Sequence, residues 1–163
     1  MPDLLATSSL PAIAAVATAK SVATVDASFL QTLLGYNARR VSLQVIELFN
    51  DRMAAYGLSP VDFSILSLIH HNPGITSRQL CSSLSLLPPN LVGKISVMEK
   101  RDLLTRVPHP DDGRAIGLHL TAAGNQMMQQ AEKTATQLEL DVSSKLTAAE
   151  AKTLLRLLQK VYL

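Results

Sequence analysis

Apolar residues recur along most of the chain at the three- and four-residue spacing of an α-helix. In the first such region, Leu34, Val41 and Leu48 lie on one stripe, and the pattern predicts a helix from Phe29 to Tyr56. Gly57 follows directly, and glycine is the residue that most often ends a helix. The sequence therefore predicts one long helix before residue 58.

Three helix start signals follow in close succession. Ser59 and Pro60 combine a capping side chain with a proline at the first helical position. Thr76 caps a short second helix, and Pro88 and Pro89 open a third that is expected to end near residue 101. The apolar residues expected on the buried faces of these helices are Phe63, Leu66, Ile69, Leu80, Leu84, Leu91, Ile95 and Met98.

A β-hairpin is predicted directly after these helices. Leu103–Val107 and Ala115–Leu120 are short extended runs, and the prolines and Gly113 between them indicate a turn. Thr121 then caps a helix expected over residues 122–145. A hairpin after a helix–turn–helix is typical of a winged helix, so the predicted fold is mostly α with a small β-hairpin wing.

The last predicted helix is apolar around more than one stripe. Thr147 and Glu150 form its capping pattern, and the chain continues with Leu154, Leu155, Leu157, Leu158, Val161 and Tyr162. A monomer rarely exposes such a surface, which favours a homodimer interface over packing of this helix on its own domain.

These elements divide the chain into four expected segments. Residues 1–27 lack a helical stripe and are interpreted as a flexible arm. Residues 28–58 form the N-terminal helix of a dimerisation region, 59–120 the winged helix-turn-helix domain, and 121–163 the C-terminal dimerisation helices.

Composition narrows the class of protein only slightly. Lys and Arg number 15 against 13 Asp and Glu, so DNA binding would depend on a local basic patch rather than on a strong overall field. The single cysteine, Cys81, excludes an internal disulfide and fits a reducing cytoplasm. No apolar run approaches the roughly 20 residues that cross a bilayer, so a cytoplasmic protein without a membrane partner is expected.

The third helix of the helix–turn–helix region would lie in the major groove of DNA. With its apolar residues turned inward, Asn90 can pair with adenine, and Gly93 allows a close backbone approach. Arg114 at the hairpin tip is a candidate for the minor groove. The predicted DNA contacts are Thr76, Ser77, Arg78, Pro89, Asn90, Gly93, Lys94, Lys100, Arg106 and Arg114. The alternatives are a solvated helix face with incidental charges, and an Arg114 that only pairs with Asp111 or Asp112.

The hairpin carries a recognisable motif. Pro110, Asp112, Arg114 and Ala115, followed by the Leu118-x-Leu120-Thr121-x-x-Gly124 run, resemble the wing of the MarR family of bacterial transcriptional regulators. The resemblance extends from Leu30 to the C-terminus in the order of helices. It implies a homodimeric winged helix-turn-helix protein, most often a repressor, that binds a palindromic operator and uses Arg114 as the minor-groove arginine.

The chain departs from the family pattern at four positions. Gly113 occupies the first of two positions that often hold arginines at the wing tip. Gly93 and Val97 stand where the recognition helix often carries arginines, and Asp102 replaces a usual glycine. Arg114 is therefore expected to carry more of the electrostatic contact than its family counterparts do.

Members of the family commonly release DNA when a small, often aromatic or anionic, compound binds between the two lobes. The polar residues expected nearest that region are Tyr36, Arg39, Arg40 and His70, and the effector would be an aromatic acid or its thioester. For each of them, a salt bridge between the lobes or a solvated charge is the alternative interpretation.

The sequence does not indicate an enzyme or a cofactor. It contains no nucleophile–base grouping and no phosphate-binding glycine loop, and the four histidines lack metal-ligand spacing. Cys81 could act as a redox trigger, but a buried structural thiol is the favoured interpretation. The alternative function is a winged-helix module for protein–protein docking that binds DNA weakly or not at all.

Overall fold

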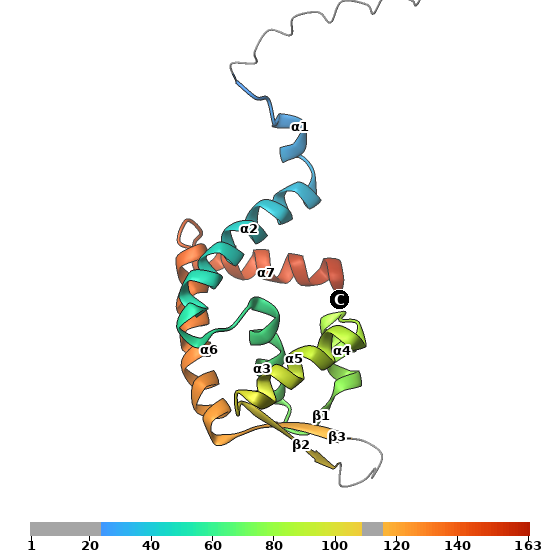
Figure 1. Cartoon of the computed structure of the whole chain (residues 1–163). Coiled ribbons are helices and arrows are strands. Elements are labelled where there is room, and N and C mark those ends of the chain that lie inside the picture. The colour runs from blue at the N-terminus through green and yellow to red at the C-terminus, as the bar shows by residue number, and fades with distance from the viewer. Residues whose placement is uncertain (1–23, 109–115) are drawn as a thin grey trace, which may run out of the picture.

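The computed structural model describes residues 24–108 and 116–163, and over these ranges the chain is mainly helical with one small sheet (Figure 1). The elements, in chain order, are α1 (Ser28–Gln31), α2 (Leu34–Met53), the 3₁₀ turn η1 (Ala54–Tyr56), α3 (Pro60–His71), β1 (Ile75–Thr76), α4 (Ser77–Leu84), α5 (Pro88–Lys100), β2 (Leu104–Pro108), β3 (Ile116–Leu120), α6 (Ala122–Val142) and α7 (Ala148–Tyr162).

The predicted helix caps are confirmed. The side chains of Ser59, Thr76 and Thr147 each close a capping box with the residue three positions later, at the starts of α3, α4 and α7. Thr121 accepts a hydrogen bond from the amide of Gly124 at the start of α6. Because each box satisfies backbone donors that a helix start leaves free, these boundaries are fixed by local sequence.

The predicted helix over residues 29–56 was wrong in its continuity. The chain forms α1, breaks at Thr32 and Leu33, and resumes as α2 before the short turn η1. Leu33 is extended, and the side-chain amide of Asn37 donates to the carbonyls of Gln31 and Leu33 across the break. An amide that hydrogen-bonds backbone carbonyls competes with the helical ladder, which explains the interruption. The predicted end at Gly57 is confirmed, with a left-handed φ of 60°.

The sheet contains one strand more than the predicted hairpin. β2 and β3 pair antiparallel, with Leu104 opposite Leu120 and Pro108 opposite Ile116, and β3 also pairs with β1 through Ile75 and Leu118. The sheet order is therefore β1-β3-β2. A two-residue strand shows no periodicity, so the sequence did not reveal β1.

The core lies between α2, α3, α4, α5, α6 and the sheet. Its completely enclosed side chains come from every one of these elements, and the largest are Met53, Ile65, Leu66, Ile69, Leu80, Leu91, Ile95, Met98, Leu118, Met128 and Leu138. The expected buried face of α3 needs one correction. Ile65 is buried, whereas Phe63 is only half-buried. Phe63 lies at the border of the core, where its ring packs edge to face against Phe49. The predicted end of α6 near residue 145 was also too late, because the helix stops at Val142.

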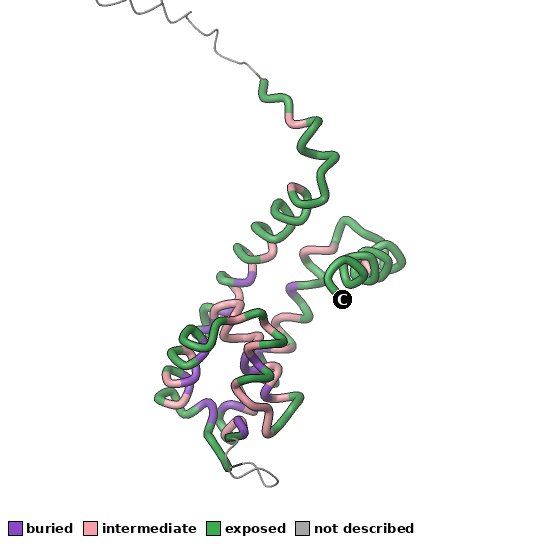
Figure 2. Tube along the Cα trace, turned by 90° about the vertical axis from the view of Figure 1, so that its right-hand side faces the viewer, coloured by how far each residue is buried: buried purple, intermediate pink, exposed green. Residues whose placement is uncertain are grey.

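The helices at the two ends of the described chain stay largely uncovered. Figure 2 shows the first turns of α2 and the whole of α7 almost entirely as exposed residues, away from the buried body of the molecule. No residue of α7 is buried, although Leu155, Leu157, Val161 and Tyr162 are large and apolar. An apolar groove runs between the two helices and is lined by Leu34, Asn37, Ala38, Val41, Ser42, Val45, Ile46, Leu154 and Leu158.

Candidate nucleic-acid interface

The helix–turn–helix consists of α4 and α5. Ser85 ends α4 in the left-handed region, with φ 51°, and this reverses the chain before Pro88 starts α5. Leu91, Ile95 and Met98 anchor α5 in the core and are at most 2% exposed. This confirms the predicted inward face, and because the three residues share one stripe, they fix which side of α5 faces outward.

The outward side of α5 carries small polar and apolar side chains and few charged ones. The predicted reading residues Pro89, Asn90, Gly93, Val97 and Lys100 are all exposed. A side-chain carbon added at Gly93 would meet nothing within 4 Å, so the backbone there is open to close approach. Val92, which is not among the predicted DNA contacts, is also 54% exposed and lies beside this surface.

Lys94, one of the predicted DNA contacts, is held by a carboxylate of its own domain. Its Nζ lies 2.8 Å from Oδ1 of Asp62, at the start of α3. Partial burial works to raise the pKa of Asp62, but hydrogen bonds from Lys94 and Ser59 outweigh it and hold the pKa below its ordinary value. The pair ties α5 to α3 and reduces the positive field that Lys94 offers to a phosphate.

Arg106, predicted to contact a phosphate, forms a two-pronged ion pair with Glu99. Its Nε and Nη2 donate to Oε1 and Oε2 of Glu99 at 2.8 and 3.0 Å. These hydrogen bonds raise the pKa of Arg106, and their parallel geometry fixes the strand β2 against the end of α5. Neither Glu99 nor Asp62 is expected as a partner from the sequence, because both contacts depend on how the elements pack.

The other basic candidates differ in their surroundings. Arg78 and Lys100 are exposed, and neither forms an ion pair within residues 24–108 and 116–163. Arg101 instead donates to the backbone carbonyls of Gly57 and Tyr56, at 2.9 and 2.6 Å, and holds the turn after α2. The hydroxyl of Thr76 is already used in the capping box with Gln79. Arg114, with the rest of the wing tip, lies outside the described residues.

The predicted effector residues are not gathered in one copy of the chain. Tyr36, Arg39 and Arg40 belong to the first turns of α2, which project away from the body that contains α3 in both views (Figures 1 and 2). His70 lies apart from these residues, on the last turn of α3, where its Nδ1 is 2.9 Å from Oδ1 of Asn125 on α6. Cys81 is partly buried and packs against the core.

A groove between α2 and α6 lies closer to the body of the protein. Its lining includes the carboxylates of Glu47, Asp51 and Asp141, with Lys145 as the one lysine or arginine among the lining residues. Such a lining does not suit an anion.

Over the described ranges, no helix is long and apolar enough to cross a membrane.

The helix α5 is anchored in the core, the short helix α4 precedes it, and a wing of two strands follows it. This arrangement defines the winged helix-turn-helix class of DNA-binding proteins. A family model described as the MarR family matches residues 56–115, which include α3, α4, α5 and the first wing strand β2. The chain belongs to the MarR family. Its relatives are transcriptional regulators, and on this basis the chain is a transcriptional regulator.

Individual relatives support the assignment along most of the chain. The transcriptional repressor CouR, solved bound to a 23-mer DNA duplex, is 32% identical and has a TM-score of 0.79, covering 85% of this chain and 98% of its own. A Thauera aromatica protein named as a regulator for the hcr operon is 28% identical, over 79% of this chain and 78% of its own. A mutant of E. coli MarR, complexed with operator DNA, is 25% identical with a TM-score of 0.74, covering 83% of this chain and 99% of its own.

Proposed function

We propose that the protein is a homodimeric repressor that binds a palindromic operator and is released from it by a small aromatic or anionic effector. The observation that carries the proposal is α5, whose core anchors leave Asn90 and Gly93 on an open outer face. The DNA-bound CouR structure, which shares this fold at 32% identity, supports placing DNA against the same surface.

Contacts to bases and contacts to phosphates come from different residues in this proposal. Asn90 reads an adenine with its amide, Pro89 and Val97 touch thymine methyl groups, and the bare backbone at Gly93 brings α5 close. The phosphate contacts come from Lys100, from Arg78 and from the backbone amide of Ser77 at the N-terminus of α4, since the amide of Thr76 already donates to Gln79. Arg114 enters the minor groove.

Lys94 and Arg106 act indirectly in this proposal. Each is paired with a carboxylate of the same domain, so their main effect is to fix the angles of α3 and β2 against α5. The local basic patch is correspondingly small, and the share of binding that falls to Arg114 is large.

The dimer is proposed to form through α2 and α7. Two copies related by a two-fold axis would present two α5 helices to the two half-sites of a palindrome. The exposed apolar residues of α7 and the apolar groove beside α2 support this placement, because a separate chain would leave both in water.

The effector is proposed to bind near Tyr36, Arg39 and Arg40 on α2, beside the dimer surface and within reach of a partner copy. Two neighbouring guanidinium groups suit a carboxylate or a phosphate, and the acidic groove between α2 and α6 does not. CouR solved with p-coumaroyl-CoA and the Mycobacterium tuberculosis MarR-family protein Rv2887 solved with salicylic acid support an aromatic acid or thioester as the class of compound.

Replacing Arg114 with alanine tests the proposal. We expect each half-site to lose roughly 1–3 kcal/mol of binding free energy and the salt dependence of binding to become shallower, because one cation leaves each protomer. Arg156→Ala is the control, since it removes the same charge from α7, far along the chain from the wing. Fluorescence anisotropy with a palindromic duplex at several salt concentrations gives both quantities. Absence of salt-sensitive DNA binding in the unchanged protein would favour the protein-docking alternative.

Asn90→Ala should change sequence preference rather than affinity in general. We expect the discrimination at one base pair per half-site to fall by roughly 1–3 kcal/mol, since the bidentate contact to adenine is lost. Lys100→Ala is the matched comparison, because a lost phosphate contact weakens all sequences equally. Selection from a randomised operator library measures both. A uniform loss across all sequences in Asn90→Ala would contradict its role in base reading.

A further inference from the structure

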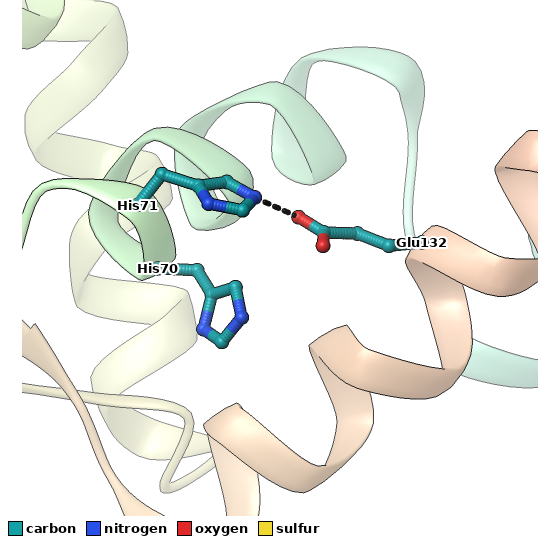
Figure 3. A group of neighbouring side chains, drawn as sticks. All are labelled: His70, His71 and Glu132. Atoms are coloured by element: carbon teal, nitrogen blue, oxygen red, sulfur yellow. Dashed lines mark hydrogen bonds and ion pairs between the residues drawn. The ribbon is translucent and has the colours of Figure 1, made fainter.

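Two adjacent histidines of α3 and one glutamate of α6 bring their side chains together on the surface of the domain (Figure 3). One nitrogen each from His70 and His71 and one carboxylate oxygen from Glu132 all lie within 4.8 Å of one another. The two rings meet edge to face, with centroids 4.9 Å apart. Because Glu132 comes from a distant helix, the spacing of the histidines in the sequence gave no sign of a ligand set.

Neighbouring side chains hold this cluster in place. The amide nitrogen of Asn125 donates to the carbonyl of Thr121, so its oxygen accepts from Nδ1 of His70, 2.9 Å away. The proton on Nδ1 leaves Nε2 of His70 with the lone pair that a metal requires. On the other side, the hydroxyl of Ser67 donates to Oε1 of Glu132 at 2.9 Å. Such outer hydrogen bonds orient the ligands in metal sites.

We propose that His70, His71 and Glu132 bind one divalent ion of the zinc type. Two imidazoles and one carboxylate are a ligand set that zinc uses when its fourth position holds water. Metal–ligand bonds of about 2.0–2.1 Å around a tetrahedral ion place the ligand atoms about 3.3 Å apart, so small side-chain rotations complete the site. Calcium and magnesium, which prefer oxygen ligands, are excluded by two nitrogen donors.

The ion would enter where a hydrogen bond now stands. Nε2 of His71 and Oε1 of Glu132 form a hydrogen bond of 2.9 Å. The ion takes the place of the hydrogen-bonded proton between these two atoms. His71 and Glu132 are 62% and 28% exposed, so an ion can reach them from solvent and keep a water as its fourth ligand. The bound ion crosslinks α3, in the winged domain, to α6. This proposal does not depend on the operator or the effector.

Metal binding is measured on the full-length protein, with any purification tag removed and with metal stripped by a chelator. We expect titration calorimetry to find one Zn²⁺ per chain, and Co²⁺ in its place to give the strong visible absorption of a tetrahedral site. His71→Ala and Glu132→Gln should each weaken binding at least tenfold. The matched controls are His119→Ala, on β3, and Glu139→Gln, two turns further along α6, and both should bind like the unchanged protein.

Asn125→Ala separates a metal site from a simple ion pair, because it leaves all three ligands in place. Loss of the residue that orients His70 should weaken Zn²⁺ binding about 10- to 100-fold. Thermal melting without metal checks that each variant folds, and added Zn²⁺ should raise the melting temperature only when the ligands are intact. Zn²⁺ binding that is equal in the unchanged protein and in the His71→Ala/Glu132→Gln double variant, or no binding at all, would overturn the proposal.

Discussion

Replacing Leu154 and Leu158 with aspartate should turn the protein into a monomer that no longer binds its operator tightly. Both leucines line the apolar groove between α7 and α2, and in a single chain both are exposed. If the groove is the dimer interface, four leucines per dimer lose their burial. Full burial of an exposed leucine is worth about 1.5–3 kcal/mol, and Leu154 and Leu158 are 42% and 37% exposed in the single chain. The lost burial therefore weakens the dimer by about 2–5 kcal/mol, which is at least about 30-fold in its dissociation constant.

The aspartates also introduce charges that cannot be desolvated cheaply, so the loss should exceed this figure. Sedimentation equilibrium measures the association, and circular dichroism shows that the separate chains remain helical. Gln159→Asp is the control because it adds a carboxylate to the polar side of the same helix, where we expect the dimer to persist. A doubly substituted protein that remains dimeric would place the interface elsewhere.

Replacing Gly124 with alanine should destabilise the folded domain by about 3 kcal/mol or more. An added side-chain carbon would overlap the carbonyl oxygen of Leu103 and lie 2.9 Å from its carbonyl carbon. This carbonyl accepts the amide hydrogen of Thr121, at the joint where the wing passes into α6. Because the obstacle is backbone, the joint has to shift as a whole, and overpacking of this kind is costly. Urea unfolding measures the loss.

The control for Gly124 is another helical glycine. At Gly93 an added carbon meets nothing within 4 Å, so alanine there should stabilise α5 by up to about 1 kcal/mol through its higher helix propensity. The same glycine-to-alanine substitution is thus expected to lower the free energy of unfolding at Gly124 and to raise it at Gly93. If Gly124→Ala unfolds at the same urea concentration as the unchanged protein, the close approach of α6 to Leu103 is not a feature of the folded state.

The structure also changes the electrostatic interpretation of the recognition surface. Lys94, Lys100, Arg101 and Arg106 lie on α5, at its end or on β2. Of these, Lys94 and Arg106 are paired with Asp62 and Glu99, and Arg101 donates to backbone carbonyls. We therefore expect fewer phosphate contacts per protomer than the number of basic residues indicates. The salt dependence of DNA binding measures the number of these phosphate contacts most directly.

Local sequence determined where most elements begin and end. Ser59, Thr76, Thr121 and Thr147 mark helix starts that the structure confirms. The inward stripe of α5 and the position of the hairpin were also correctly predicted. Asp102, which stands where the family usually has a glycine, adopts a left-handed backbone with φ 56°. These features depend on hydrogen bonds and side-chain directions within a few residues, so the spacing of residue types is enough to specify them.

Tertiary packing decided what the spacing of residues could not. The strand β1 exists because Gly117 of β3 lets the backbone at Gly74 approach, since a side chain there would lie 2.9 Å from the Gly74 carbonyl oxygen. The partners of Lys94 and Arg106, and the meeting of His70 and His71 with Glu132, likewise depend on which faces of separate elements are pressed together. Contacts of this kind join residues far apart in the chain, and only the folded core brings them within bonding distance.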